Sequence, residues 1–194
     1  MKRISAILLA AGFSSRMGAL KPLLPVGDTS ALLRAIGVLQ DAGAARISVV
    51  TGYRHGEVAA EASLSGARVV YNERFADGML SSVQAGVSSL PSDTDGFFLL
   101  PADCCAVGSG VLRRLTAEFD GAHILYPVCN GRRGHPPLVP YSAAEPLLRY
   151  TGEDGARGCL AQFPARDIET GDGTVLLDMD TPEGYAQLLR ALNL

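Results

Sequence analysis

The chain carries its most informative stretch near the N-terminus, Leu8-Leu-Ala-Ala-Gly-Phe-Ser-Ser-Arg-Met-Gly-Ala-Leu-Lys-Pro-Leu-Leu-Pro25. An apolar run at residues 4–10 predicts a buried strand that leads into Ala10-Ala11-Gly12. Backbone amides between such small side chains can approach phosphate oxygens closely, and Arg16 and Lys21 supply positive charge for a polyanion. The stretch therefore predicts a phosphate-binding loop, with a purely structural turn as the open alternative.

Two common phosphate-binding motifs do not fit this stretch. The sequence has no G-x-x-x-x-G-K followed by Ser or Thr, and Gly12 followed by Gly18 does not give G-x-G-x-x-G. The loop is therefore neither a P-loop nor a dinucleotide-binding fingerprint.

Short apolar runs alternate with segments of helical periodicity along the chain, a pattern typical of βαβ units. The length of 194 residues and the apolar content of 47% suit one core, so we predict a single domain over residues 1–194. The predicted fold class is α/β, with a mostly parallel twisted sheet and helices on both faces. The predicted strands are 4–10, 47–51, 68–71, 96–103, 123–128, 137–140 and 174–178, and the predicted helices are 28–42, 56–64, 79–89, 109–119, two stretches within 143–162, and 182–192.

Charge and composition favour a small-molecule partner. A net charge of −3 argues against binding to a nucleic-acid backbone. The apolar run from Ile4 to Ala11 is too short to span a bilayer and lacks a cleavage pattern, so we expect no membrane association and a cytoplasmic location. None of the cysteines has C-x-x-C spacing, which predicts reduced thiols, with a Cys104–Cys105 redox pair as the alternative.

The spacing of small residues, Arg, Met-Gly and Lys gives a more specific signal. The pattern L-A-A-G-x-S-x-R-M-G-x-x-K-x-L-L-P resembles the signature loop of the MobA-like NTP transferase family, in particular its molybdenum cofactor cytidylyltransferase branch. The resemblance implies a Rossmann-like fold of the nucleotide-diphospho-sugar transferase type. Later stretches fit the family in the same order, namely Asn72-x-x-Phe75-x-x-Gly78-Met79-x-Ser81-Ser82-x-x-x-Gly86, Leu-Leu-Pro-Ala-Asp103, Gly134-His135-Pro136-Pro137-Leu138 and Asp178-x-Asp180-Thr181-Pro182-Glu183.

Details of the loop favour one branch of that family. Members that transfer GMP tend to show A-G-G and D-K-G, whereas this chain has A-A-G and a lysine before Pro22 and L-L-P, which favours CTP. Sugar-phosphate nucleotidyltransferases usually show G-x-G-T-R-M with a proline before the lysine, and they are the runner-up.

The chemistry of nucleotidyl transfer explains these residue types. An acceptor phosphate must reach the α-phosphorus while pyrophosphate leaves, so the developing charge has to be neutralised. We expect Arg16 and Lys21 to bind the triphosphate and stabilise that charge, and Asp103 to act as a ligand of Mg²⁺. These three residues are the predicted catalytic set. The alternative for Asp103 is a cap of the following helix.

A second metal ligand is expected from Asp178-Met179-Asp180, placed at the end of the predicted last strand. Alternation along a strand would point both carboxylates to one side. The resemblance favours Asp180, with Asp178 in reserve, while capping of the final helix before Pro182 is the alternative.

The resemblance also implies the remaining site residues. His135 is expected to shape the acceptor pocket. One departure concerns Cys105, which stands where the family commonly has proline and puts the loop after Asp103 in question. The predicted nucleotide-binding residues are Leu9, Ala10, Ala11, Gly12, Arg16, Lys21, Thr51, Gly52, Asn72, Gly78 and Ser82.

The expected activity is transfer of CMP from CTP to the terminal phosphate of a molybdopterin-type cofactor, with release of pyrophosphate and Mg²⁺ as cofactor. A molybdenum hydroxylase is a further partner that the resemblance implies. Two alternatives stay open: an enzyme that uses a sugar phosphate or another alcohol phosphate, and a non-catalytic chaperone that holds the cofactor for such a hydroxylase.

Overall fold

The central strand of the sheet is β1 (Ile4–Ala10), whose residues are almost all buried. The computed structural model describes residues 2–14 and 17–194, and in it β1 pairs in parallel with β4 (Ile47–Thr51) and with β6 (Gly96–Pro101). All three strands are mostly apolar and almost entirely buried, as expected for strands covered on both faces. Their carboxyl ends lie at one edge of the sheet, where α/β proteins place ligands.

The strand order across the described part of the sheet is β10-β7-β9-β6-β1-β4-β5, with β8 paired to β7. β9 runs antiparallel to β6 and β7, and β8 antiparallel to β7, while the other pairings are parallel. The predicted fold class, a mostly parallel α/β sheet, is confirmed. The further strands are β5 (Arg68–Tyr71), β7 (Ile124–Cys129), β8 (Arg132–Arg133), β9 (Leu138–Pro140) and β10 (Ala165–Glu169), and β2 (Pro25–Val26) with β3 (Thr29–Ser30) forms a separate hairpin.

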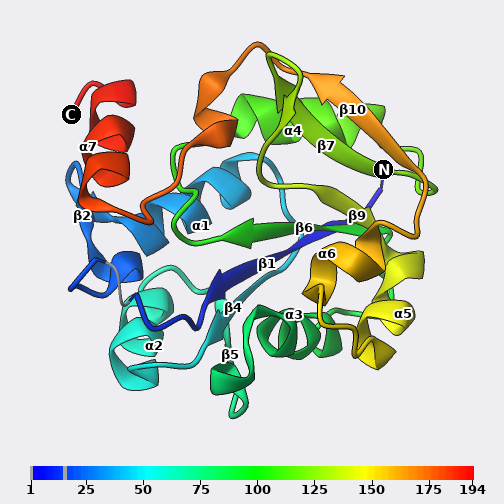
Figure 1. Cartoon of the computed structure of the whole chain (residues 1–194), viewed down its shortest axis with the longest axis horizontal. Helices are drawn as coiled ribbons and strands as arrows, with labels where there is room; N and C mark the ends of the chain where they lie inside the picture. Colours follow the sequence, from blue (N-terminus) through cyan, green and yellow to red (C-terminus); the bar gives the residue numbers. More distant parts are fainter. Residues whose placement is uncertain (1, 15–16) are drawn as a thin grey trace.

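Helices cover both faces of the sheet (Figure 1). Because side chains alternate along β1, Ala6 and Leu8 pack on the face covered by α1, α2, α4 and α7, whereas Ile7 packs on the face covered by α3, α5 and α6. None of the helices within the described ranges has the length and apolar character needed to cross a membrane. The helices are α1 (Ala31–Asp41), α2 (His55–Ser63), α3 (Met79–Ser88), α4 (Ser109–Glu118), α5 (Ala144–Arg149), α6 (Gly155–Leu160) and α7 (Pro182–Ala191).

A glycine brings α3 close to the sheet. A Cβ atom added to Gly86 would lie 2.3 Å from Ile7 Cγ2 and 3.1 Å from Val50 Cγ2. Only a residue without a side chain lets the helix approach β1 and β4 this closely. The close approach fixes the amino end of α3 relative to the carboxyl edge of the sheet.

The predicted strand at 174–178 is wrong. Residues Gly173–Leu176 form a 3-10 helix (η4) that Asp172 caps through a hydrogen bond from the Thr174 amide to Oδ1. Val175 and Met179 are buried, so their apolar character reflects packing under the sheet and not strand pairing. The final strand is instead β10, an edge strand in which only Ile168 is buried, so it lacks the apolar run that would have predicted it.

The first helix also begins later than its predicted start at residue 28. Residues 25–30 form the β2–β3 hairpin, with Gly27 at φ +66°, and Ser30 then caps α1 by accepting a hydrogen bond from the Leu33 amide at 3.2 Å.

Candidate active site

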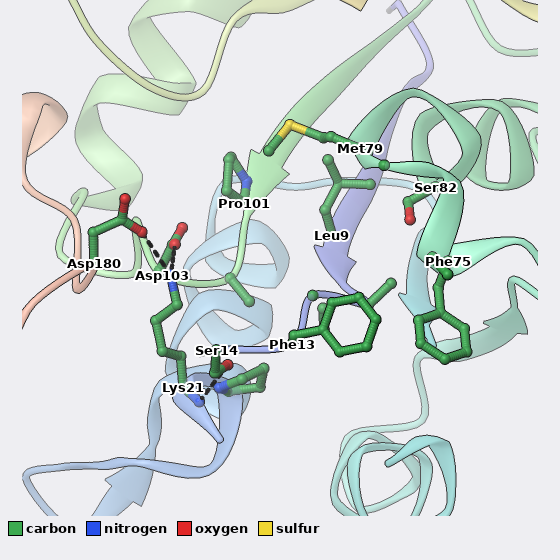
Figure 2. Close-up of a pocket in the computed structure, with 17 residues that line it drawn as sticks. Leu9, Phe13, Ser14, Lys21, Phe75, Met79, Ser82, Pro101, Asp103 and Asp180 are labelled. Atoms are coloured by element: carbon green, nitrogen blue, oxygen red, sulfur yellow. Dashed lines mark hydrogen bonds and ion pairs between the residues drawn. The ribbon is translucent and has the colours of Figure 1, made fainter. Parts of the chain in front are cut away.

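A cavity of about 530 Å³ opens at the carboxyl ends of β1 and β6 (Figure 2). The loop after β1 forms one wall, the start of α3 a second, and the loop after β6 a third. Nine of the predicted site residues line this cavity, namely Leu9, Ala10, Ala11, Gly12, Lys21, Gly78, Ser82, Asp103 and Asp180. Arg16 lies outside the described residues, so its role stays a prediction.

Small residues let the surrounding loops close around the end of β1. The Ala11 carbonyl accepts a hydrogen bond from the Tyr53 amide at 3.1 Å. A Cβ atom on Gly52 would lie 2.4 Å from Phe75 Cβ and 2.9 Å from Ala11 Cβ, whereas one on Gly12 would meet nothing within 4 Å. Gly52 therefore packs behind the cavity, and Gly12 faces open space at its wall.

Lys21 joins the two predicted metal ligands. Its Nζ lies 2.6 Å from Asp103 Oδ2 and 2.7 Å from Asp180 Oδ1, and we call these three residues the Lys21 cluster (Figure 2). Burial alone would lower the pKa of Lys21, but hydrogen bonds and charge from the two aspartates outweigh it and raise that pKa. The Lys21 amide also donates to Ser14 Oγ at 3.1 Å, which ties the cluster to the loop after β1.

Asp180 is not the cap of the final helix. The cap of α7 is Thr181, whose Oγ1 accepts a hydrogen bond from the Gly184 amide at 3.1 Å, and Pro182 follows at the first helical position. This leaves the Asp180 carboxylate to contact Lys21. Asp178 does not line the cavity; its Oδ1 accepts a hydrogen bond from the Asp180 amide at 3.0 Å and so orients its neighbour.

The expected alternation of these aspartates along a strand is wrong, because η4 and extended chain replace the strand. The two side chains consequently have different roles. The helix-capping alternative for Asp103 is also excluded, since α4 begins only at Ser109 and has Gly108 as its cap residue.

Asn72 and Thr51 support the cavity from behind. Asn72 is buried, and its Nδ2 donates to Ser81 Oγ at 2.8 Å and to Ser82 Oγ at 3.0 Å. Thr51 is also buried, with its Oγ1 2.7 Å from His55 Nδ1. Neither residue lines the cavity, nor does Gly52, so direct nucleotide contact by these three has no support in the geometry.

His135 lies outside the cavity lining as well. Its amide donates to the Val175 carbonyl at 2.8 Å, and a Cβ atom on Gly134 would lie 2.2 Å from the same oxygen, so this loop packs tightly on η4. His135 is exposed as a residue, but the surrounding protein desolvates its imidazole and lowers its pKa, while the charges of Asp103 and Asp178 act in the opposite direction. His135 therefore stands beside the acidic side of the site.

The loop after Asp103 is closed by packing. Cys105 is fully buried, and its carbonyl accepts a hydrogen bond from Arg34 Nε at 3.1 Å. All the cysteines are buried, and none of them, including Cys104 and Cys105, forms a disulfide in the structure. The departure from proline thus leaves Asp103 in the cavity.

Sequence reasoning gave no role to several residues that line the cavity. Phe13 follows Gly12 directly and is 51% exposed, which is unusual for a phenylalanine. The signal in the sequence is a large apolar residue within a predicted ligand-binding loop. Phe75 and Met79 belong to a quoted motif but carried no assignment. The further lining residues that the prediction omitted are Ser14, Pro22, Ala76, Pro101 and Ala102.

The protein supplies few metal ligands of its own. Among the described residues no group of three or more His, Cys, Asp and Glu side chains could hold a metal ion. Two carboxylate oxygens that share one cation do suit Mg²⁺, which keeps several waters and takes further oxygens from substrate phosphates.

A mostly parallel sheet, a loop of small residues at its carboxyl edge and a lysine between two carboxylates define a nucleotidyltransferase-type α/β domain. The chain belongs to the MobA-like NTP transferase domain family, whose model matches residues 6–168.

Individual relatives agree with this assignment over nearly the whole chain. The molybdenum cofactor cytidylyltransferase of Escherichia coli (strain K12) is 32% identical over 188 residues, which is 95% of each chain. The crystal structure of Rv0371c from Mycobacterium tuberculosis H37Rv is 29% identical, with a TM-score of 0.85 over 97% of this chain and 98% of that one. A structure of Rv0371C in complex with manganese from the same organism is 27% identical, with a TM-score of 0.81 over the same shares.

Proposed function

We propose that the chain transfers CMP from CTP to the terminal phosphate of a molybdopterin-type cofactor. An oxygen of the acceptor phosphate attacks the α-phosphorus of CTP, the bond from that phosphorus to the β-phosphate oxygen breaks, and pyrophosphate leaves. The support comes from the A-A-G loop with its following lysine and from the relative that is named a molybdenum cofactor cytidylyltransferase.

The observation that carries the proposal is the Lys21 cluster at the end of a loop of small residues, inside one cavity. The backbone of Ala10 to Gly12 faces the same space as Lys21, so one triphosphate can contact both. Positive charge fixed in this position stabilises the charge that develops on the leaving pyrophosphate. Arg16 is expected to add to it.

Asp103 and Asp180 would hold the Mg²⁺ ion that we propose as cofactor. Such an ion neutralises charge on the phosphates and orients them for in-line attack. The manganese complex of the M. tuberculosis relative supports a divalent cation in this fold. The Lys21 ammonium, which contacts both carboxylates, offsets their mutual repulsion.

The test is pyrophosphate release, measured with CTP, GTP, ATP and UTP, each offered with molybdopterin and with common sugar phosphates in the presence of Mg²⁺. We expect release with CTP and molybdopterin. Preference for GTP would overturn the branch assignment, and release only with a sugar phosphate would make the chain a sugar-phosphate nucleotidyltransferase. Binding of molybdopterin with no release from any pair would identify the non-catalytic chaperone.

A further inference from the structure

The cavity has two chemically different ends. The Lys21 cluster lies on one side of the cavity, and the rings of Phe13 and Phe75 lie on the other, with Leu9 between them and Pro101 (Figure 2). Figure 2 shows the rings of Phe13 and Phe75 next to each other and away from Lys21, Asp103 and Asp180. With a divalent cation on the two aspartates, the Lys21 side of the cavity suits phosphates, whereas the two rings suit a flat or apolar group.

Phe13 is held in place yet remains half exposed. Its ring centroid lies 5.3 Å from that of Tyr53 and 5.4 Å from that of Phe75, with interplanar angles of 44° and 55°. Both contacts are tilted, a favourable arrangement for aromatic pairs. Even so, 51% of Phe13 is exposed, and leaving that much apolar surface in water is unfavourable. Tyr53 and Phe75 thus hold the Phe13 ring in place, while its exposed surface remains accessible to a ligand.

The place of Phe13 in the chain limits what that ligand is. Phe13 comes directly after Gly12, the residue that opens the loop toward the cavity, and Ser14 then binds the Lys21 amide. The aromatic ring and the phosphate-facing backbone are therefore adjacent parts of one loop. We propose that Phe13 is the stacking residue for the nucleobase of a bound nucleoside triphosphate.

This inference rests on the proposed function only in taking the cavity as a nucleoside triphosphate site. Every nucleobase has an aromatic face, so stacking on Phe13 adds affinity without choosing between bases. The preference for CTP then has to come from polar groups elsewhere in the cavity. Phe13 therefore increases the affinity for a nucleotide over that for bare polyphosphate, but it does not discriminate cytosine from guanine.

The first test compares a ligand that has a base with one that lacks it. Calorimetric titration of the Phe13→Ala variant with CTP and Mg²⁺ should show affinity about tenfold weaker than in the unchanged protein, because a base stacked on an aromatic ring contributes on that order. Titration with inorganic tripolyphosphate should give the same affinity in both. Phe13→Tyr should keep CTP affinity, and Phe13→Leu, which is apolar but not aromatic, should lose most of what Phe13→Ala loses.

Leu64 provides a matched control, since it is 75% exposed at the end of α2 and does not line the cavity. Leu64→Ala should change neither affinity. A second reporter uses the absence of tryptophan from the sequence, because Phe13→Trp creates a single indole at the proposed stacking position. CTP and GTP should both quench its fluorescence, tripolyphosphate should not, and Leu64→Trp should respond to none of them.

Unchanged CTP affinity in Phe13→Ala would overturn the proposal, as would an equal loss for CTP and tripolyphosphate, which would indicate a collapsed loop. CTP binding no tighter than tripolyphosphate binding in the unchanged protein would also overturn it. These results are separate from the fate of the proposed function. Nucleotide binding that depends on Phe13 without any CMP transfer would refute the transferase and leave the stacking role in place.

Discussion

The Nζ atom of Lys21 lies 2.6 Å from Oδ2 of Asp103, although 82 residues separate the two in the chain. Lys21 begins a short 3-10 helix (Lys21–Leu23) that follows the loop after β1, and Asp103 comes from the loop after β6, the strand that pairs with β1 in parallel. The parallel register brings the carboxyl ends of both strands to one edge. The contact between a phosphate-side cation and a metal-side carboxylate is thus a direct consequence of the sheet.

Replacement of Lys21 should abolish most activity. Lys21→Met removes the charge that faces the cavity, and we expect kcat/KM for pyrophosphate release to fall by about 100- to 1000-fold, the range for loss of one stabilising group. Lys2, the other lysine of the chain, bonds the Phe119 carbonyl away from the cavity and provides the control Lys2→Met. Activity within a few-fold of normal in Lys21→Met would refute the role.

Variants of Asp103, Asp178 and Asp180 should differ in the Mg²⁺ concentration that they need for activity. Asp103→Asn and Asp180→Asn should each raise the Mg²⁺ concentration for half-maximal activity by about 100-fold or more, because each removes a proposed ligand. Asp178→Asn should have a smaller effect, about tenfold, because Asp178 acts only through its bond to the Asp180 amide. If Asp178→Asn were as severe as Asp180→Asn, the assignment of the second ligand would have to be reversed.

Gly86 should be intolerant of a side chain. Its added Cβ would meet Ile7 Cγ2 at 2.3 Å, so Gly86→Ala should lower the free energy of unfolding by about 1–3 kcal/mol, as measured by urea denaturation. Gly37 in α1 is a matched helical glycine with no atom within 4 Å of an added Cβ. Gly37→Ala should instead stabilise the protein by about 0.5–1 kcal/mol. Equal effects at both sites would contradict the packing of α3 on β1.

Burial should make the Cys104 and Cys105 thiols unreactive in the folded protein. Desolvation raises the pKa of both thiols, that of Cys105 to about 11, and the thiolate is the reactive form. A water-soluble thiol reagent should therefore label these residues only after denaturation. Rapid labelling of either residue in the native protein would show that the loop after Asp103 opens.

The same shift of Cys105 gives a pH dependence of stability. The buried thiol stays neutral where the unfolded thiol, with a pKa near 9, already ionises, so the thiol's contribution is intact below pH 9 and is lost between pH 9 and about 11. In Cys105→Ala the free energy of unfolding should fall less over this range. The same pH dependence of the free energy of unfolding in the unchanged protein and in Cys105→Ala would contradict this prediction.

Much of the fold could be predicted because its inner strands are short apolar runs and most of its helices have apolar residues at helical spacing. β1, β4 and β6 are mostly apolar, and α1 has one apolar face. β10 could not be predicted because an edge strand needs few buried residues, and the apolar residues Val175, Leu176 and Leu177 indicate a strand where η4 lies instead. The local sequence pattern does not show whether an apolar residue is buried in a strand of the sheet or in a non-strand segment that packs against the core.

Only part of the site could be predicted, because residue type does not show which polar side chains face the cavity. Residue type and motif order brought out Lys21, Asp103 and Asp180, but only the fold shows that one cation joins them. Asn72 and Thr51 have polar side chains that suit a ligand equally well, and their burial behind the cavity could not be inferred from spacing. The cytoplasmic location and the molybdenum hydroxylase partner stay predictions.

The most direct test of the central claim is a crystal structure with Mn²⁺ and a CTP analogue that resists cleavage between its α- and β-phosphates. We expect an anomalous manganese peak next to Asp103 and Asp180, phosphates against the backbone of Ala10 to Gly12, and Lys21 in contact with the same triphosphate. A nucleotide bound outside this cavity, or a manganese peak that neither aspartate contacts, would contradict it.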